Sequence, residues 1–250
     1  MGIVTEREAV EAAFGRAAVK LGHARERLDG ELGVYERDGH VVAISAHRLG
    51  LTAVPAIDHL AHLERVDIGG NRLVELPALP ASVRELYIYD NQLERLPALP
   101  RLRVLDANRN ALVELPPLHE IDFVYAASNR LAAPPVMTGC RYVNLGGNPL
   151  ARLPRDPAIR ELRVEDAGLT SLPASIAELV GLRELHLRGN RLTALPALPA
   201  TLRVLDLRGN QLDELPDLSH LPLVKLDLRW NPLRNPPAWL DRLRDALVYT

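Results

Sequence analysis

The chain has 250 residues, of which 47% are hydrophobic, so it is long enough to bury a substantial core. Its formal net charge of −2 excludes the broad basic face that sequence-independent nucleic-acid binding requires, and we expect no nucleic-acid partner. A single cysteine excludes an internal disulfide and any zinc site built from several cysteines.

The first residues, MGIVTEREAVEAAF, contain no basic segment followed by a long apolar run, which argues against a secretory signal. No stretch approaches the roughly 18 apolar residues of a membrane-spanning helix. We therefore expect a cytoplasmic protein without membrane association, with secretion without a cleavable signal as the alternative. Lys20 and Lys225 are the only lysines among the 30 basic residues, which is typical of a GC-rich bacterial genome.

Residues 1–39 predict an N-terminal cap made of a helix and a hairpin. Thr5 and Glu8 have capping-box spacing at the start of an apolar stripe with helical periodicity. The stripe consists of Val10, Phe14, Ala17, Leu21 and Leu28 and extends the expected helical region over residues 5–29. The run VYERDGHVVAI (34–44) then places Asp38–Gly39 between two β-like segments, which indicates a hairpin. A hydrophobic cap is favoured here over a partner-binding helix.

Residues 40–237 contain about ten copies of the unit LxxLxLxxNxLxxLP, at steps of 19 to 23 residues. Eight copies carry asparagine at the same slot: Asn71, Asn91, Asn110, Asn129, Asn148, Asn190, Asn210 and Asn231. A buried amide can donate and accept, so this column can satisfy the turning backbone of the next copy. Leu49 and Ala167 occupy the slot in the first and seventh copies, where we expect local irregularity.

Within each unit, alternation sends one set of side chains to a core and the other to solvent. In the copy ELYIYDNQL, Leu86 and Ile88 face the core, and Glu85, Tyr87 and Tyr89 face solvent. One unit cannot cover its own leucines, so neighbouring units must stack into a parallel sheet along a solenoid. Proline in the LPxLP connectors favours extended or polyproline geometry, which predicts a thin back and modest curvature. Only residues 175–181 look helical, with Ser175 and Glu178 at capping-box spacing.

Residues 238–250 predict a second helical cap. Trp239, Leu240, Leu243 and Leu247 follow Pro236–Pro237 with the spacing of a short amphipathic helix.

The repeat resembles that of the leucine-rich-repeat family over about residues 40–237. Connectors such as LPALPASV (76–83) and LPALPRL (96–102) are similar to the short bacterial subclass found in host-directed effectors of enteric pathogens. The resemblance implies an α/β solenoid, a right-handed superhelix of about ten repeats with a parallel concave β-sheet, a mostly extended convex side and helical caps at both ends. Such effectors often continue into a ubiquitin-ligase domain whose catalytic cysteine is followed two residues later by aspartate. Here that pair is Cys140 and Tyr142, and we reject a ligase function.

The outward-facing strand positions are the predicted binding surface. The central column runs Ser45, Asp67, Tyr87, Asp106, Tyr125, Asn144, Arg163, His186, Asp206 and Asp227. The chain has only two Trp, six Tyr and two Phe, and five of these fall on the outward face of repeats 3 to 6: Tyr87, Tyr89, Phe123, Tyr125 and Tyr142. Aromatic side chains offer large contact area with few rotors to immobilise, so this group predicts the centre of a protein-binding face. Cross-strand packing alone is the competing interpretation.

The C-terminal half of the same face is charged. Besides His186, it displays Arg163, Arg188, Arg208 and Arg229 beside Glu165, Asp206 and Asp227. A solvated ladder of cross-strand ion pairs is favoured over a site for an acidic ligand. Trp230 marks either a second anchor or a cover for the last repeat.

Catalytic motifs are missing from the sequence. No phosphate loop, nucleophile elbow or HExxH zinc helix occurs, so we assign no catalytic, cofactor-binding or metal-binding residues and predict no enzyme activity. His59 and His62 are interpreted as surface histidines rather than metal ligands, and Cys140 as a buried, inert thiol. The sequence thus predicts a monomeric, non-catalytic scaffold or adaptor that binds a protein. An effector or immunity-type protein and a substrate-positioning subunit of an enzyme complex are the alternatives.

Overall fold

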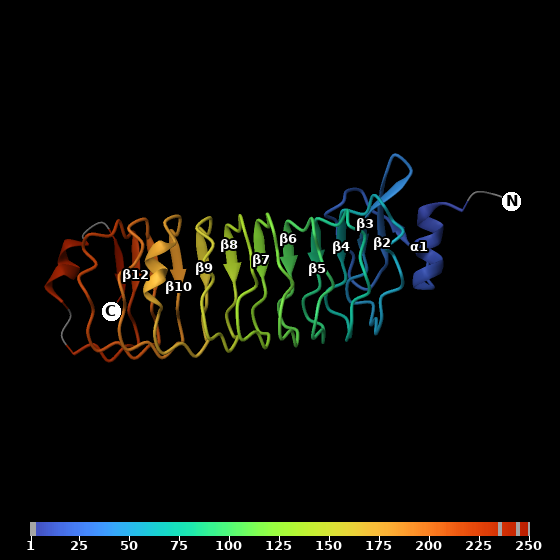
Figure 1. Ribbon diagram of the computed structural model, residues 1–250. Coiled ribbons are helices and arrows are strands. Elements are labelled where there is room, and N and C mark those ends of the chain that lie inside the picture. Colours follow the sequence, from blue (N-terminus) through green and yellow to red (C-terminus); the bar gives the residue numbers. More distant parts are fainter. Residues whose placement is uncertain (1–3, 235–236, 244–245, 250) are drawn as a thin grey trace.

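The computed structural model, which describes residues 4–234, 237–243 and 246–249, is a solenoid with about ten turns and little helix. Its described strands form one 13-stranded sheet in which every strand neighbours the one before it in sequence. Figure 1 shows these strands following one another along a nearly straight axis, with the two chain ends at opposite ends of the rod. The thin connectors account for this shape, because the back of each repeat is hardly wider than its front.

The N-terminal cap begins with helix α1 (Glu6–Phe14), and the predicted capping box of Thr5 and Glu8 is present. The helix ends at Gly15, which adopts the left-handed conformation with φ 64°, and Val10 and Phe14 are its buried residues. The apolar stripe beyond Phe14 is therefore not helical. Leu21 is buried but follows the short strand β1 (Val19–Lys20), while Ala17 is exposed.

The predicted hairpin lies between β2 (Gly33–Arg37) and β3 (His40–Ser45), which pair antiparallel. Its turn uses positive φ at both Asp38 (54°) and Gly39 (80°), as a tight two-residue hairpin requires. Strand β1 pairs parallel with β2, so the cap extends the sheet as well as covering its first repeat.

The remaining repeats each contribute one three-residue strand, and each pairs parallel with the next. These strands are β4 (Arg65–Asp67), β5 (Glu85–Tyr87), β6 (Val104–Asp106), β7 (Phe123–Tyr125), β8 (Tyr142–Asn144), β9 (Glu161–Arg163), β10 (Glu184–His186), β11 (Val204–Asp206) and β12 (Lys225–Asp227). The middle residue of every strand is buried, as the alternation predicts. Stacked leucines such as Leu86, Leu105 and Leu162, all 0% exposed, form one continuous core.

Most connectors on the convex side have no regular secondary structure. The exception within the repeats is the 3₁₀ helix η1 (Ala174–Glu178), whose N-cap is Pro173 and which has no side-chain cap. The predicted Ser175–Glu178 capping box is therefore wrong. The helix begins before Ser175, which places that hydroxyl inside the first turn rather than in front of it.

The asparagine column ties each turn to the one before it. Nδ2 of Asn71 donates to the carbonyl of Ile68 in its own turn (2.8 Å) and to that of Ala46 in the preceding copy (2.9 Å). Its Oδ1 accepts from the amide of Leu51, 3.0 Å away in the preceding copy. We expected the amide to serve the next copy, and this direction is wrong, because the side chain lies over the preceding turn. At the Ala167 gap, Oδ1 of Asn190 accepts from two amides, those of Ala167 and Leu169.

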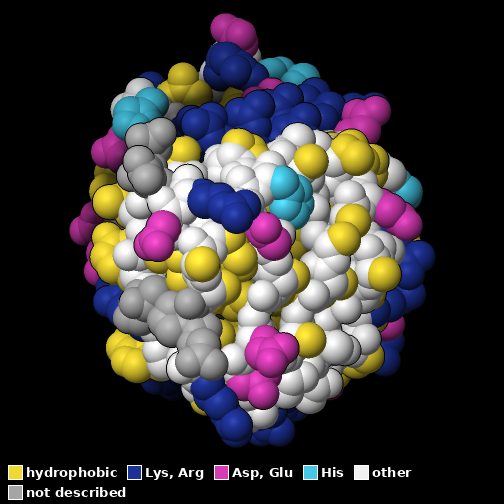
Figure 2. Space-filling model, turned by 90° about the vertical axis from the view of Figure 1, so that its left-hand side faces the viewer, with side chains coloured by type: hydrophobic (Ala, Val, Ile, Leu, Met, Phe, Trp, Pro, Cys, Tyr) yellow, Lys and Arg dark blue, Asp and Glu magenta, His cyan; other side chains and the backbone are white. Residues whose placement is uncertain are grey.

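The C-terminal cap is the 3₁₀ helix η2 (Ala238–Arg242) followed by strand β13 (Leu247–Tyr249). Trp239 is buried at 7% exposure, but Leu247 pairs with Lys225 in the sheet, so its predicted place in the helix is wrong. Pro236, the first residue of the predicted proline pair, lies outside the described residues. Figure 2 looks along the rod at this end, where hydrophobic side chains lie among polar and backbone atoms and Lys and Arg gather along the upper rim. In the described part of the chain, no helix has the length and apolar character to cross a membrane.

Candidate functional site on the concave face

The concave face is the side of the sheet that displays the first and third residues of each strand. Strand register brings the predicted central column together: Asp67 pairs with Tyr87, Asp106 with Tyr125, and so on to Asp206 and Asp227. The outward residues are half-buried or exposed where the aromatic residues lie, whereas the middle residues are buried. The repeat therefore holds these side chains at fixed positions on a rigid surface.

Three of the five predicted aromatic residues form a group that we call the aromatic cluster: Phe123, Tyr125 and Tyr142. The rings of Tyr125 and Tyr142 lie 4.7 Å apart between centroids with their planes inclined by 35°. Phe123 is in register with Tyr142 and is 39% exposed. No charged side chain is stacked on these rings among the described residues. The cluster is thus a contiguous, partly open aromatic surface on β7 and β8.

Tyr87 and Tyr89 lie apart from that cluster, separated from it by the strand that carries Asp106. The guanidinium of Arg65 lies 4.0 Å from the centre of the Tyr87 ring. The Tyr87 hydroxyl donates to Glu85 at 3.3 Å. The single aromatic group predicted from the sequence is therefore two groups, and the tyrosines of the first one are occupied by contacts within the chain.

The N-terminal segment 22–30 covers the first part of the concave face, which the sequence did not predict. Arg27 donates to the Asp67 carboxylate at 2.7 Å and lies 5.4 Å from the centre of the Tyr89 ring. Arg25 bonds Glu85 at 3.0 Å, and Asp29 lies 2.8 Å from His47. A cavity of about 740 Å³ remains beside this segment, between it and the turns of repeats 3 to 6.

Burial controls the ionisation of the tyrosines and of the aspartate between the two aromatic groups. It raises the pKa of the phenols of Tyr87, Tyr89, Tyr125 and Tyr142 above their ordinary value, so all stay neutral at physiological pH. Burial, with a smaller contribution from Asp67, also raises the pKa of Asp106. Neutral phenols can donate and accept hydrogen bonds, which suits them to contact with a polar protein surface.

The charged half of the face is paired mainly along the strands rather than across them. Arg208 bonds Asp206 two residues earlier at 2.5 Å, and Arg229 bonds Asp227 at 2.7 Å. Arg163 bonds Glu161 at 2.6 Å in the same way. Among the described arginines of this half, Arg208 also makes a contact across strands, to Asp227 at 3.4 Å. The predicted cross-strand ladder is therefore wrong in direction. The internal pairing leaves these guanidinium groups less available to an acidic ligand.

Two predicted binding residues on this half, Arg188 and Trp230, are not held by a described carboxylate of their own strand. Arg188 is exposed and forms no ion pair among the described residues. Trp230 is 69% exposed, with Arg229 5.6 Å from its ring centre, so it does not cover the last repeat. Strand β13 lies beside β12 instead. The exposure of Trp230 thus argues against the cover for the last repeat, and the second anchor stays a prediction.

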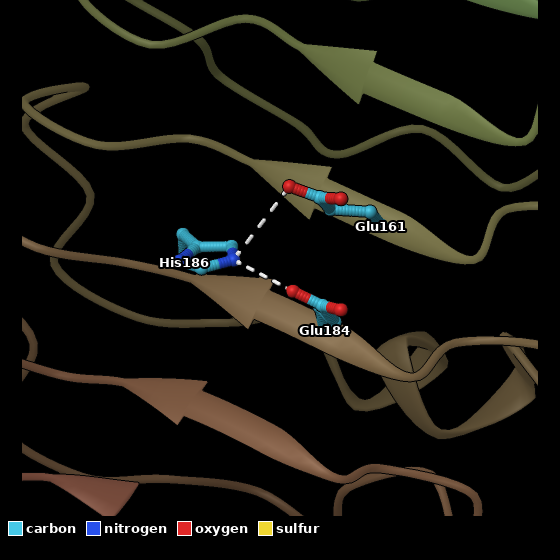
Figure 3. Close-up of side chains that lie close together, drawn as sticks. All are labelled: Glu161, Glu184 and His186. Carbon is cyan, nitrogen blue, oxygen red and sulfur yellow. Dashed lines mark ion pairs between the residues drawn. The ribbon is translucent and has the colours of Figure 1, made fainter. Parts of the chain in front are cut away.

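A group on β9 and β10 joins the predicted residue His186 to two glutamates that the repeat pattern did not single out, Glu161 and Glu184. His186 points toward the carboxylates of Glu161 and Glu184 (Figure 3). Its Nε2 lies 3.8 Å from Glu161 Oε1 and 3.5 Å from Glu184 Oε2. Burial, helped by Arg163, lowers the pKa of His186 to about 4, so its imidazole is neutral at physiological pH. The sequence feature that could have predicted this group is the spacing Glu-x-His at Glu184 and His186, with Glu161 at the position of Glu184 one repeat earlier.

The other residues considered for chemistry have structural surroundings. Cys140 is 0% exposed, its amide bonds Asp156, and burial raises the pKa of its thiol to about 12. His59 and His62 are exposed, and the His62 ring lies 3.9 Å from that of His40.

Comparisons with known proteins agree with this architecture. The chain matches the family model described as Leucine Rich repeats (2 copies) over residues 180–220. Podocan-like protein 1 from Mus musculus is 35% identical over 161 residues, which cover 56% of this chain and 28% of that protein. YopM from Yersinia enterocolitica WA-314 matches with a TM-score of 0.64 and 31% identity over 76% of this chain and 47% of that one. A Shigella effector LRR domain matches with a TM-score of 0.51 and 27% identity, covering 58% of this chain and 67% of that one. The chain thus spans less than half the length of the first two relatives.

Proposed function

We propose that this chain, which has leucine-rich repeats like those of bacterial effectors, is a non-catalytic scaffold or adaptor that binds a protein partner through its concave face. Leucine-rich-repeat proteins generally mediate protein–protein interactions. The aromatic cluster of Phe123, Tyr125 and Tyr142 is the proposed centre of contact. The proposed compartment of the protein is the cytoplasm.

The exposure of the aromatic cluster is the observation that carries this proposal. The leucine core already holds β7 and β8 together, so stability does not require three large rings on the outside. The chain has two phenylalanines, and one of them, Phe123, is 39% exposed on this face. Rigid, partly open aromatic surface is the type that dominates binding energy at protein interfaces.

The charged half of the face plays a second part in the proposal. Arg188 and Trp230 are exposed side chains that are available as additional anchors. The paired arginines around them set the orientation of the partner more than its affinity, because each is already neutralised by a carboxylate of its own strand. Tyr87 and Tyr89 contribute only at the edge, since Arg65 and Arg27 lie on their rings.

The test is affinity capture from a lysate of the source organism, followed by mass spectrometry. The bait is the full chain, compared with the variant Tyr125→Ala/Tyr142→Ala. The matched control is Val136→Ala/Val180→Ala, which removes side chains that are 63% and 66% exposed and lie outside the strands. We expect a protein that is retained by the parent and the control but lost with the tyrosine variant. A capture profile that is the same for all three baits would contradict the proposal.

An effector role is the second candidate, and the match to the Shigella effector LRR domain favours it. In that case the partner belongs to another cell, and the protein leaves the source organism. A secretion assay separates the two, because an effector is found in the culture medium while a resident adaptor stays with the cells.

A further inference from the structure

We propose that Glu161, Glu184 and His186 bind a divalent transition metal ion of the zinc type on the concave face. This site lies beside the aromatic cluster, because Glu161 is in register with Tyr142, but the proposal does not rest on the proposed protein partner.

The strand register places the three ligands together. Glu184 pairs with Glu161 across β9 and β10, and His186 follows two residues later on the same face. One ligand atom of each residue lies within 4.8 Å of the others. A zinc ion bonds nitrogen and carboxylate oxygen at about 2.0–2.2 Å, which separates tetrahedral ligands by roughly 3.4 Å. The observed distances from His186 Nε2, 3.5 and 3.8 Å, therefore leave room for an ion between the groups (Figure 3).

The imidazole itself points to a missing ligand. Nε2 of His186 is buried and has no hydrogen-bond partner among the described residues, and the side chain is only 12% exposed. Its distances to both carboxylates are too long for hydrogen bonds. A buried polar atom without a partner is costly, and a metal ion at this position would satisfy it.

Of the two carboxylates, only that of Glu161 has an arginine or lysine partner among the described residues. Like charges at paired positions of neighbouring strands repel each other. Arg163 bonds Glu161 at 2.6 Å, but Glu184 has no Lys or Arg partner in the described part of the chain. With a metal bound, Arg163 would act as the outer partner that fixes the orientation of the Glu161 carboxylate.

The ligand set selects the type of ion. One imidazole nitrogen with two carboxylates suits zinc, cobalt or manganese, whereas calcium and magnesium require more oxygen ligands than the site offers. The two carboxylates are more exposed than the imidazole, with Glu161 at 24% and Glu184 at 43%, so a fourth coordination position would open toward solvent on their side. Water or a side chain of another molecule can occupy it.

Titration of the chelator-treated full chain with Co²⁺, followed by its visible absorption, tests the proposal, with Zn²⁺ as a competitor. The variants are His186→Gln and Glu184→Gln. The control is His62→Gln, which removes a histidine outside the cluster whose ring lies 3.9 Å from that of His40. We expect one saturable site per chain, displaced by Zn²⁺ and not by equimolar Mg²⁺, with affinity reduced roughly tenfold or more in both cluster variants and unchanged in the control.

Three outcomes would overturn the proposal: no saturable binding by the parent, equal affinity in the cluster variants and the parent, or loss of binding in His62→Gln instead. Circular dichroism melts without metal establish that each variant is folded. Glu184→Gln is less expected to unfold the chain than His186→Gln, because the Glu184 side chain is 43% exposed and that of His186 is 12% exposed.

Discussion

The ring of Tyr125 packs against that of Tyr142 on the neighbouring repeat, with centroids 4.7 Å apart. This contact orders two large side chains before any partner arrives, so less conformational entropy remains to be lost on binding. The same arrangement depends on the scaffold beneath it, and the stability of that scaffold can be tested residue by residue.

Replacing Asn129 with alanine should lower the free energy of unfolding by about 2–3 kcal/mol. Its amide donates to the carbonyls of Ala107 (2.9 Å) and Ala126 (3.1 Å) and accepts from Leu112 (3.0 Å), and the substitution leaves these groups buried without partners. Urea denaturation followed by circular dichroism measures the loss. Arg130→Ala, an exposed change next to it, should be nearly neutral. Equal midpoints for the two variants would contradict the role of the asparagine column.

Removing Arg27 should destabilise the N-terminal segment more than removing Arg25. The Arg27 guanidinium faces the carboxylate of Asp67, whose side chain is only 2% exposed, whereas the partner of Arg25 is 20% exposed and Arg25 itself is 76% exposed. We expect Arg27→Ala to cost about 1–2 kcal/mol and Arg25→Ala less than about 1 kcal/mol. Thermal unfolding compares them, and the reverse order would show that the segment is not held through Asp67.

The stability of the chain should fall as the pH drops from about 6.5 toward 4 in metal-free buffer. His186 is neutral in the folded state down to about pH 4, because burial and Arg163 lower its pKa from 6.5. The unfolded chain therefore binds a proton in this window that the folded chain does not, and stability is lost as acid is added. The loss at this site is on the order of 2–3 kcal/mol.

The control for this pH effect is His186→Gln, which cannot titrate. Glu161, Glu184, Asp206 and Lys225 also face His186 and remain in the variant, so their contribution is common to both proteins. The urea midpoint of the parent should fall relative to that of His186→Gln as the pH drops from about 6.5 to 4. A difference between variant and parent that does not change with pH would rule out His186 as the source.

Cys140 should not react with iodoacetamide in the native protein at pH 8. The side chain is 0% exposed and burial raises its thiol pKa to about 12, so almost no thiolate is present or accessible. Mass spectrometry should detect alkylation only after denaturation. Cysteine introduced at the exposed position Ser171 serves as a positive control and should be labelled in the native state. Rapid native labelling of Cys140 would contradict its burial.

The repeat made most of the fold predictable. Alternation assigned Leu86 and Ile88 to the core, and the Asp38–Gly39 turn predicted the hairpin, because both follow from local geometry. The ends were less predictable. Leu28 and Leu247 have helical spacing, but Gly15 ends the first helix and pairing with β12 draws Leu247 into the sheet. Tertiary contacts therefore override the local pattern at both ends.

The candidate site was predictable only in part. Strand register placed Tyr125 beside the position of Asn144 and next to Tyr142, as the repeat spacing requires. The contact of Arg27 with Tyr89 joins segments about 60 residues apart, and no periodicity encodes it. The approach of His186 to Glu161 depends on side-chain direction as well as register, which a sequence pattern does not specify.

Binding affinity for the captured partner tests the central claim most directly. Isothermal titration of that protein should give a dissociation constant about thirtyfold or more weaker for Tyr125→Ala/Tyr142→Ala than for the parent, because two central aromatic contacts are removed. The Val136→Ala/Val180→Ala control should bind like the parent. Equal affinity of the tyrosine variant and the parent, with unchanged circular dichroism, would show that the aromatic cluster is not where the partner binds.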